Sequence, residues 1–218
     1  MGLEAVVFDL DGVLIETEEV WDAVREGYVR EHGGRWPPQA TTAMMGMSSP
    51  EWARYLAEEL GVALDPEVIG REVLDRVTAR YAKSLPVVDG AAAAVREVAG
   101  RWPLGLASSS NRPLIDLVLD RLGLTACFRV TVSSEEVARG KPAPDVYLAA
   151  AAGLGAAPAG CAAVEDSSNG LLAAAAAGMR VLAVPNRRFP PAPEALRVAE
   201  AIVGALPEVP AALRRLAG

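Results

Sequence analysis

The sequence has few of the features that mark secreted, membrane-spanning or myristoylated proteins. It contains two cysteines in 218 residues, so buried, reduced thiols at Cys127 and Cys161 are favoured over a disulfide. No apolar stretch reaches the length of a membrane span without a glycine, proline or charge. The first residues also lack the order of a signal peptide, because Glu4 and Asp9 interrupt it. We therefore expect a soluble cytoplasmic protein that has no membrane partner.

Positive charge is not concentrated anywhere along the chain. The formal net charge is −7 at pH 7, and no run rich in lysine and arginine occurs. Nucleic acid is therefore not an expected partner, because binding its phosphate backbone requires a basic face. A small anion needs only a few local donors and stays possible as a ligand. With 51% hydrophobic residues, the chain can form one domain with a buried core, or one that carries a smaller insertion.

Five short apolar runs predict the strands of a parallel sheet. The runs are continuous rather than alternating, which is typical of strands that are covered on both faces. Segments with helical character follow the later runs, so strand and helix alternate and predict a Rossmann-like, doubly wound α/β fold. The predicted strands are 3–9, 103–108, 128–133, 161–165 and 180–184, and the predicted helices after them are 112–122, 145–152 and 170–177.

The first crossover is much longer than the others. More than ninety residues separate Asp9 from the second run, whereas a simple crossover needs about a dozen. Apolar residues recur at helical spacing in 17–33, 49–61 and 66–84. We therefore expect a helical insertion at 16–85 and a catalytic core made of 1–15 and 86–218. The C-terminal stretch predicts a proline-rich loop followed by one or two exposed helices.

The first apolar run ends in two carboxylates, Asp9 and Asp11, which are followed by Gly12. Two carboxylates about 5 Å apart repel each other by roughly 3 kcal/mol at an effective dielectric constant of 20. A divalent cation would offset this repulsion, because hard cations prefer oxygen ligands. The structural alternative is a solvated Asp-Gly turn.

Three further polar groups follow later runs. Ser108 lies at the end of the second run, where a hydroxyl can receive a phosphate or simply cap the next helix. Lys141 lies between a glycine and a proline, in a stiff loop that favours a fixed positive charge over a solvated one. Glu165 and Asp166 end the fourth run just before a predicted helix, so either a metal ion or the helix dipole would account for them.

All of these groups lie at the carboxyl ends of predicted parallel strands. That edge is where open α/β sheets bind their ligands. Two acidic pairs, a hydroxyl cluster and one lysine together predict a site for a phosphate that is held with a metal ion.

Four motifs in order resemble those of the haloacid dehalogenase superfamily of phosphohydrolases; they are "DLDGVL", "ASSS", "GKPAPDVY" and "VEDSSNG". The resemblance covers nearly the whole chain, and the insertion resembles the small cap domain of this family. The run "DGVLIETEEVW", with "GMSS" further on, is similar to β-phosphoglucomutase-like members and sugar-phosphate phosphatases. The resemblance implies a phosphomonoester hydrolase that uses Mg²⁺ and acts on small phosphorylated sugars or polyols.

The resemblance also implies roles for individual residues. Asp9 would attack phosphorus and form an aspartyl-phosphate, while Asp11 would act as general acid and then general base. Ser108 and Lys141 would hold the phosphoryl oxygens. The metal ligands would be Asp9, Asp11 through its backbone carbonyl, Glu165 and Asp166.

Contacts to the substrate are expected from the second motif and from the insertion. For Trp21 a core position in the insertion is favoured, because it lies at helical spacing on an amphipathic segment. His32 is expected to be a loop residue without a catalytic role. The candidate substrate contacts are Ser109, Ser110, Asn111, Gly46, Glu19 and, as the alternative to its core position, Trp21.

Two departures from the family's sugar phosphomutases bear on the reaction. Those enzymes carry a histidine where this chain has Val20 and Trp21, and an arginine where it has Ser49. Because a mutase must hold two phosphates in turn, hydrolysis is the expected reaction. Closure of the cap is expected to exclude water during the first step of that reaction. A β-phosphoglucomutase-type mutase and a non-catalytic phosphometabolite-binding protein stay as alternatives. We expect a monomer or a homodimer.

Overall fold

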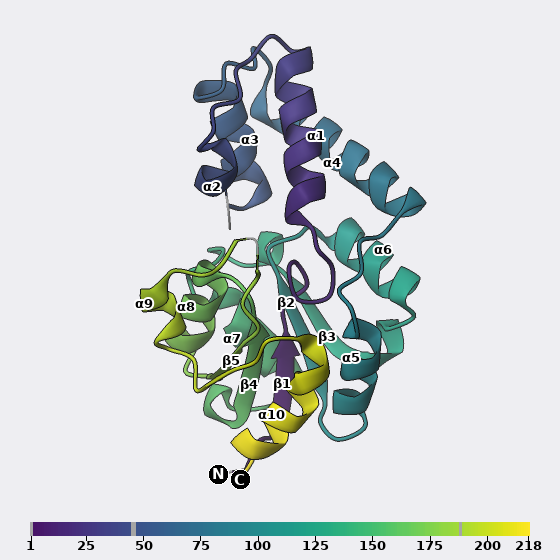
Figure 1. Cartoon of the computed structure of the whole chain (residues 1–218), viewed down its shortest axis with the longest axis vertical. Helices are drawn as coiled ribbons and strands as arrows, with labels where there is room; N and C mark the ends of the chain where they lie inside the picture. The colour runs from purple at the N-terminus through teal and green to yellow at the C-terminus, as the bar shows by residue number, and fades with distance from the viewer. Residues whose placement is uncertain (1, 45–46, 188) are drawn as a thin grey trace. The chain divides into compact units, whose positions relative to one another are not determined.

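The computed structural model describes residues 2–44, 47–187 and 189–218, and the chain divides into two compact units (Figure 1). The α/β unit comprises Met1–Glu16 and Val87–Gly218, and the helical unit comprises Thr17–Pro86. The predicted insertion differs from the helical unit by one residue at each end. Within the described ranges, no helix is both long enough and apolar enough to span a bilayer.

The α/β unit is built on one six-stranded sheet with the order β3-β2-β1-β4-β5-β6. All of its strand pairs are parallel, which confirms the predicted doubly wound α/β class. The strands are β1 Ala5–Phe8, β2 Leu104–Ser108, β3 Phe128–Ser133, β4 Cys161–Glu165, β5 Arg180–Ala183 and β6 Ala201–Ile202. The first five follow the predicted apolar runs. The sixth was not predicted, because two residues at a sheet edge leave no recognisable apolar run.

Helices alternate with these strands along the chain. The helices of the α/β unit are α5 Ala91–Ala99, α6 Arg112–Leu122, α7 Asp145–Leu154, α8 Ser168–Ala176, α9 Pro193–Leu196 and α10 Val209–Leu216. Side chains of α7, α8 and α9 share one buried cluster with alternate residues of β1 to β5, and many of these side chains are alanines. Small side chains let helix and sheet approach closely, so the alanine-rich segments are core helices.

The C-terminal helix differs from the prediction. We expected an exposed helix, but Val209, Ala212 and Leu213 of α10 are buried. The helix packs against α5 and β5. Its apolar residues recur at helical spacing, so one face joins the core while Arg214 and Arg215 lie in the last turn.

The two cysteines differ from each other in burial. Cys161 on β4 is fully buried, whereas Cys127 is only half-buried, and both are free thiols. The expectation of burial is therefore wrong for Cys127. It ends a short 3-10 helix at Thr125–Cys127, just before β3, rather than lying inside a strand.

Among its described residues the helical unit has four helices, α1 Glu18–Glu31, α2 Ala40–Met44, α3 Ser49–Glu58 and α4 Pro66–Lys83. Its core contains Trp21 and Trp52, whose rings meet edge to face with centroids 5.8 Å apart. The Arg25 guanidinium lies 4.6 Å from the centroid of Trp21 and 4.9 Å from that of Trp52. These contacts tie α1 to α3 by aromatic and cation–π packing.

The order in which successive strands are added to the sheet reverses at β1. The chain continues from β1 into β2 on one side, whereas β4 pairs with the other side of β1. Such a reversal opens a crevice at the carboxyl ends of the strands, where doubly wound sheets bind ligands. Asp9, Ser108 and Glu165 all lie at or directly after these strand ends.

Candidate active site

Asp9 and Lys141 form a buried ion pair at this edge of the sheet. Asp9 follows β1 directly, and its backbone N–H donates to the Val164 carbonyl on β4 at 3.0 Å. The Lys141 ammonium donates to Asp9 Oδ1 at 2.7 Å. Asp9 is 4% exposed and Lys141 is 8% exposed, so water screens this pair little.

Lys141 also donates to Glu165 Oε1, at 2.6 Å, so that its ammonium lies between two carboxylates. Burial by itself would lower the pKa of Lys141, but the charges of Asp9 and Glu165 raise that pKa above its ordinary value. Lys141 therefore stays protonated, which confers the fixed positive charge that the sequence predicted.

Glu165 accepts hydrogen bonds on both of its carboxylate oxygens. Oε1 accepts the Tyr147 hydroxyl at 2.8 Å in addition to Lys141. Oε2 accepts the Asp166 N–H at 2.9 Å, and the Ser167 N–H and hydroxyl, each at 3.1 Å. This carboxylate is fully buried and is held by five donors.

Two glycines leave the space that these carboxylates occupy. A Cβ atom at Gly170 would lie 1.7 Å from Glu165 Oε1, and one at Gly12 would lie 1.9 Å from Asp166 Oδ2. Gly12 has a φ of +80°, in the left-handed region that glycine adopts readily. Both positions must therefore be glycine for the acidic groups to lie where they do.

Asp11 interacts with the end of β2. Its Oδ2 accepts the Ser108 hydroxyl at 3.1 Å and the Ser110 hydroxyl at 2.9 Å. The Ser110 N–H donates in turn to Ser108 Oγ at 2.9 Å. The structure thus brings the first and second motifs together, with the Ser108 hydroxyl directed to Asp11; its role toward a phosphoryl group stays a prediction.

The remaining residues of the second motif differ in burial. Asn111 is buried and caps α6, because its side-chain oxygen accepts the Leu114 N–H at 3.1 Å. Ser109 is half-buried. Contact of Ser109, Ser110 and Asn111 with a substrate stays a prediction.

One oxygen from each of three buried acids, Asp9, Glu165 and Asp166, lies within 4.8 Å of the others. Burial raises the pKa of Asp9 well above its ordinary value, and the charges of Glu165 and Asp11 add to this effect while Lys141 opposes it. Three carboxylates here face one ammonium, so the cluster has an excess of negative charge. Oxygen donors and excess negative charge fit a hard divalent cation.

The predicted contacts from the insertion belong to the helical unit. Glu19 and Trp21 lie on α1, and Trp21 is buried against Trp52, as a core aromatic would be. Gly46 falls outside the described residues. A role of these three residues toward the substrate stays a prediction.

Two other residues of the helical unit make contacts within that unit. Ser48 is the N-cap residue of α3 and belongs to a capping box, in which Glu51 accepts the Ser48 N–H at 2.7 Å. His32, just after α1, stacks on Tyr28 with ring centroids 4.2 Å apart.

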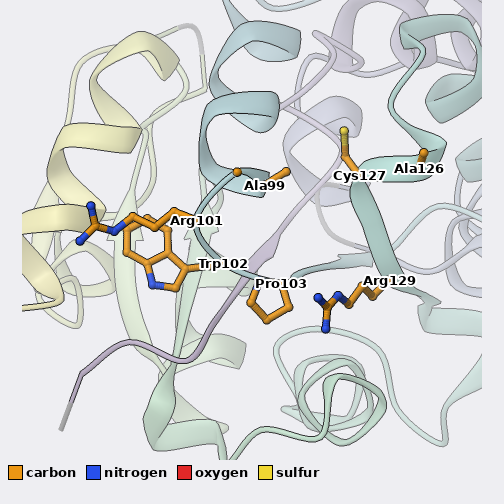
Figure 2. A pocket seen from close by; sticks show the side chains of 8 residues that line it. Ala99, Arg101, Trp102, Pro103, Ala126, Cys127 and Arg129 are labelled. Atoms are coloured by element: carbon orange, nitrogen blue, oxygen red, sulfur yellow. The ribbon is translucent and has the colours of Figure 1, made fainter.

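A separate cavity of about 570 Å³ lies near the amino ends of β2 and β3, at the opposite edge of the sheet from the acidic cluster. Figure 2 shows Arg101, Trp102 and Pro103 on one side of it and Cys127 and Arg129 on the other. The cavity contains none of the predicted site residues.

Sequence reasoning did not assign a role to Tyr147, Ser167 or Gly170. All three contact, or make room for, Glu165. A signal was present, because Tyr147 ends the "GKPAPDVY" motif, while Ser167 and Gly170 belong to "VEDSSNG". What the motifs could not provide is the distance between these side chains and Glu165.

A family model described as haloacid dehalogenase-like hydrolase matches residues 3–178. Among curated relatives, the bifunctional riboflavin kinase/FMN phosphatase of Arabidopsis thaliana is 35% identical over 83% of this chain; the match spans 48% of that longer protein. Fructose-1-phosphate phosphatase YqaB of Escherichia coli (strain K12) is 32% identical over 80% of this chain and 92% of its own length. Hexitol phosphatase B from the same strain is 33% identical over 83% of this chain and 83% of its own length.

Solved structures share the fold over nearly the whole chain. β-Phosphoglucomutase from Clostridium difficile has a TM-score of 0.82 with 21% identity, covering 98% of both chains, and this likeness concerns the fold alone. CbbY from Rhodobacter sphaeroides, solved in complex with phosphate, has a TM-score of 0.81 with 27% identity, covering 95% of this chain and 96% of that one.

Proposed function

Because the chain belongs to the haloacid dehalogenase-like hydrolases, we propose that it is an Mg²⁺-dependent phosphatase of sugar or polyol monophosphates. The family match and the relatives named as phosphatases support phosphomonoester hydrolysis. One observation carries the proposal, namely the buried contact of Lys141 with Asp9 beside Glu165 and Asp166. The proposed nucleophile, a buried ammonium and a cluster of carboxyl oxygens thereby lie together at one edge of the sheet.

Asp9 is the proposed nucleophile. Lys141 opposes the rise in the pKa of Asp9 and so favours its ionised, nucleophilic form. In the first step an Asp9 carboxylate oxygen bonds to phosphorus while the bond from phosphorus to the sugar oxygen breaks. Lys141 would also contact the phosphoryl oxygens as negative charge builds up on them.

Asp11 is the proposed proton carrier. In the first step its carboxyl group gives a proton to the departing alkoxide. In the second step its carboxylate takes a proton from the water whose oxygen attacks phosphorus, which releases inorganic phosphate and restores Asp9. Hydrogen bonds from Ser108 and Ser110 orient Asp11 for both transfers.

The acidic cluster is the proposed Mg²⁺ site. Asp9 and Asp166 would bind the ion through their carboxylates, together with the Asp11 backbone carbonyl. Glu165 would add its charge, and its direct ligation stays a prediction because five donors already contact it. When bound, Mg²⁺ supplies positive charge that neutralises the phosphoryl oxygens.

A sugar or polyol phosphate is the proposed substrate class. Two relatives that are more than 30% identical are named for fructose-1-phosphate and for hexitol substrates. We propose no further partner for the reaction, which a monomer or a homodimer would carry out. Hydrolysis is favoured over phosphoryl transfer within one sugar because the histidine and arginine of the mutases are replaced by Val20 or Trp21 and by Ser49.

The test is phosphate release from a panel of sugar, polyol and nucleotide monophosphates, with Mg²⁺ and with EDTA. Mg²⁺-dependent release from a sugar or polyol phosphate, abolished in Asp9→Asn and kept in the exposed control Asp120→Asn, supports the proposal. Isomerisation of a hexose phosphate without phosphate release, followed by ³¹P NMR, would establish a mutase instead. Saturable binding without turnover would establish a phosphometabolite-binding protein.

A further inference from the structure

Tyr147 is a buried residue that touches both members of the Lys141–Glu165 pair. Its hydroxyl donates to Glu165 Oε1 at 2.8 Å, the same oxygen that accepts Lys141 at 2.6 Å. The Lys141 ammonium also lies 5.0 Å from the centroid of the Tyr147 ring. Tyr147 is fully buried, so its hydroxyl is removed from bulk water and directed to Glu165.

The far side of the Glu165 carboxylate is also held. Three donors from Asp166 and Ser167 contact Oε2. A carboxylate offers about four lone-pair sites, and five donors use them fully. Gly170 leaves the necessary space, because a Cβ atom there would lie 1.7 Å from Oε1.

We infer that Tyr147 is a positioning residue that fixes the Lys141 ammonium against Asp9 by holding the Glu165 carboxylate. A lysine side chain is long and flexible, and Lys141 reaches Asp9 from a loop. Two side chains donate to Glu165 Oε1, Lys141 from this loop and Tyr147 from helix α7. Because Tyr147 is held in a helix, its hydroxyl sets where that oxygen lies. The inference rests on the proposed function, in which Lys141 contacts the nucleophile.

The variant Tyr147→Phe isolates the hydroxyl, because phenylalanine keeps the ring and its contact with the ammonium. A matched control is Tyr28→Phe in the helical unit. Tyr28 is also fully buried and donates to a carboxylate oxygen, Glu72 Oε2, at 2.9 Å. Both variants lose the same chemical group, but only one of them loses it next to Lys141.

The Lys141 ammonium can be observed directly by NMR, since the sequence contains only two lysines, Lys83 and Lys141. Lys83 is exposed, whereas Lys141 is buried and hydrogen-bonded to two carboxylates. In protein labelled with ¹⁵N-lysine, the Nζ protons of Lys141 should exchange slowly with water, with Lys83 as the fast internal reference. This measurement needs no substrate and no catalytic turnover.

We expect Tyr147→Phe to speed the exchange of the Lys141 Nζ protons and to lower kcat, each by about tenfold, the usual effect of losing a hydrogen bond to a charged group. KM should stay within about twofold, because the positioned group acts on the transition state. Tyr28→Phe should change neither quantity.

Exchange and kcat that both stay at the wild-type values in Tyr147→Phe would overturn the inference. Faster exchange with an unchanged kcat would also overturn it, because the hydroxyl would then order the lysine without serving the reaction. If the wild-type protein hydrolyses no phosphomonoester, the proposed function fails. The exchange rates alone then decide whether Tyr147 holds Lys141.

Discussion

Gly12 lies directly against Asp166, since a Cβ atom at residue 12 would be 1.9 Å from Asp166 Oδ2. The two residues come from β–α connections that are far apart in the sequence. No side chain fits between them, so the backbone after β1 and the carboxylate after β4 form one surface. Because Asp166 is a proposed metal ligand, this contact links a backbone position to the chemistry of the site.

Gly12→Ala is therefore expected to abolish phosphatase activity by displacing Asp166. The control is Gly178→Ala, in the same unit and with the same φ of +80°, where nothing lies within 4 Å of the added Cβ. Each alanine should cost about 1–2 kcal/mol of stability from the left-handed backbone. Kinetics of both variants check this, and Gly12→Ala activity equal to that of Gly178→Ala would contradict it.

Lys141→Met should destabilise the protein at pH 7, because it leaves Asp9 and Glu165 buried without their cation. Removing one partner of a buried pair costs about 3–5 kcal/mol. Glu165→Gln should lower the free energy of unfolding less in the Lys141→Met background than in the wild type. In that background it removes a buried charge that no longer has its cation. Urea unfolding of the four proteins measures this coupling, and Lys83→Met is the control for an exposed lysine. Strictly additive effects would show that Lys141 and Glu165 do not interact.

Stability should depend on pH through Arg112 and Glu136. Arg112 donates twice to the Glu136 carboxylate, at 2.9 Å each, and these hydrogen bonds lower the pKa of Glu136 below its ordinary value of 4.5. A lowered folded-state pKa stabilises the protein above the unfolded-state pKa, and this stabilisation is lost as the pH falls through the folded-state value. The difference in melting temperature between wild type and Glu136→Gln should therefore be largest near neutral pH, shrink as the pH falls below the ordinary value of 4.5, and vanish once the pH lies below the lowered folded-state pKa.

The neighbouring Glu135→Gln is a control for the pH experiment, because Glu135 is exposed and lies in the same short 3-10 helix, Ser134–Glu136. Its melting temperature should follow that of the wild type at every pH. A Glu136→Gln difference that persisted at low pH would assign the effect to packing instead of charge.

Mg²⁺ should raise the melting temperature of the wild-type protein relative to EDTA, because a ligand that binds only the folded state stabilises it. At one hundred times its dissociation constant the ion would contribute about 2.7 kcal/mol. Asp166→Asn should remove this shift, whereas Asp120→Asn, an exposed change on α6, should keep it. Equal shifts in the two variants would place the ion elsewhere.

Much of the fold follows from the sequence, because parallel strands that are covered on both faces must be apolar throughout. The runs that end at Ser108, Ser133 and Glu165 therefore mark β2, β3 and β4 with their carboxyl ends. The prediction failed where the local pattern is weak, as for β6, which is two residues long. It also failed for α10, whose buried face depends on its packing against α5 and β5.

The sequence by itself determined which polar residues lie at the carboxyl edge of the sheet, because strand ends follow from the apolar runs and parallel strands end at one edge. Only the tertiary structure decided which of them touch. Asp9 and Lys141 are 132 positions apart, and Tyr147 and Glu165 are 18 apart. Hydrogen bonds need donor and acceptor atoms within about 3 Å, and such distances depend on how helices pack on the sheet. Periodicity along the chain does not encode that packing.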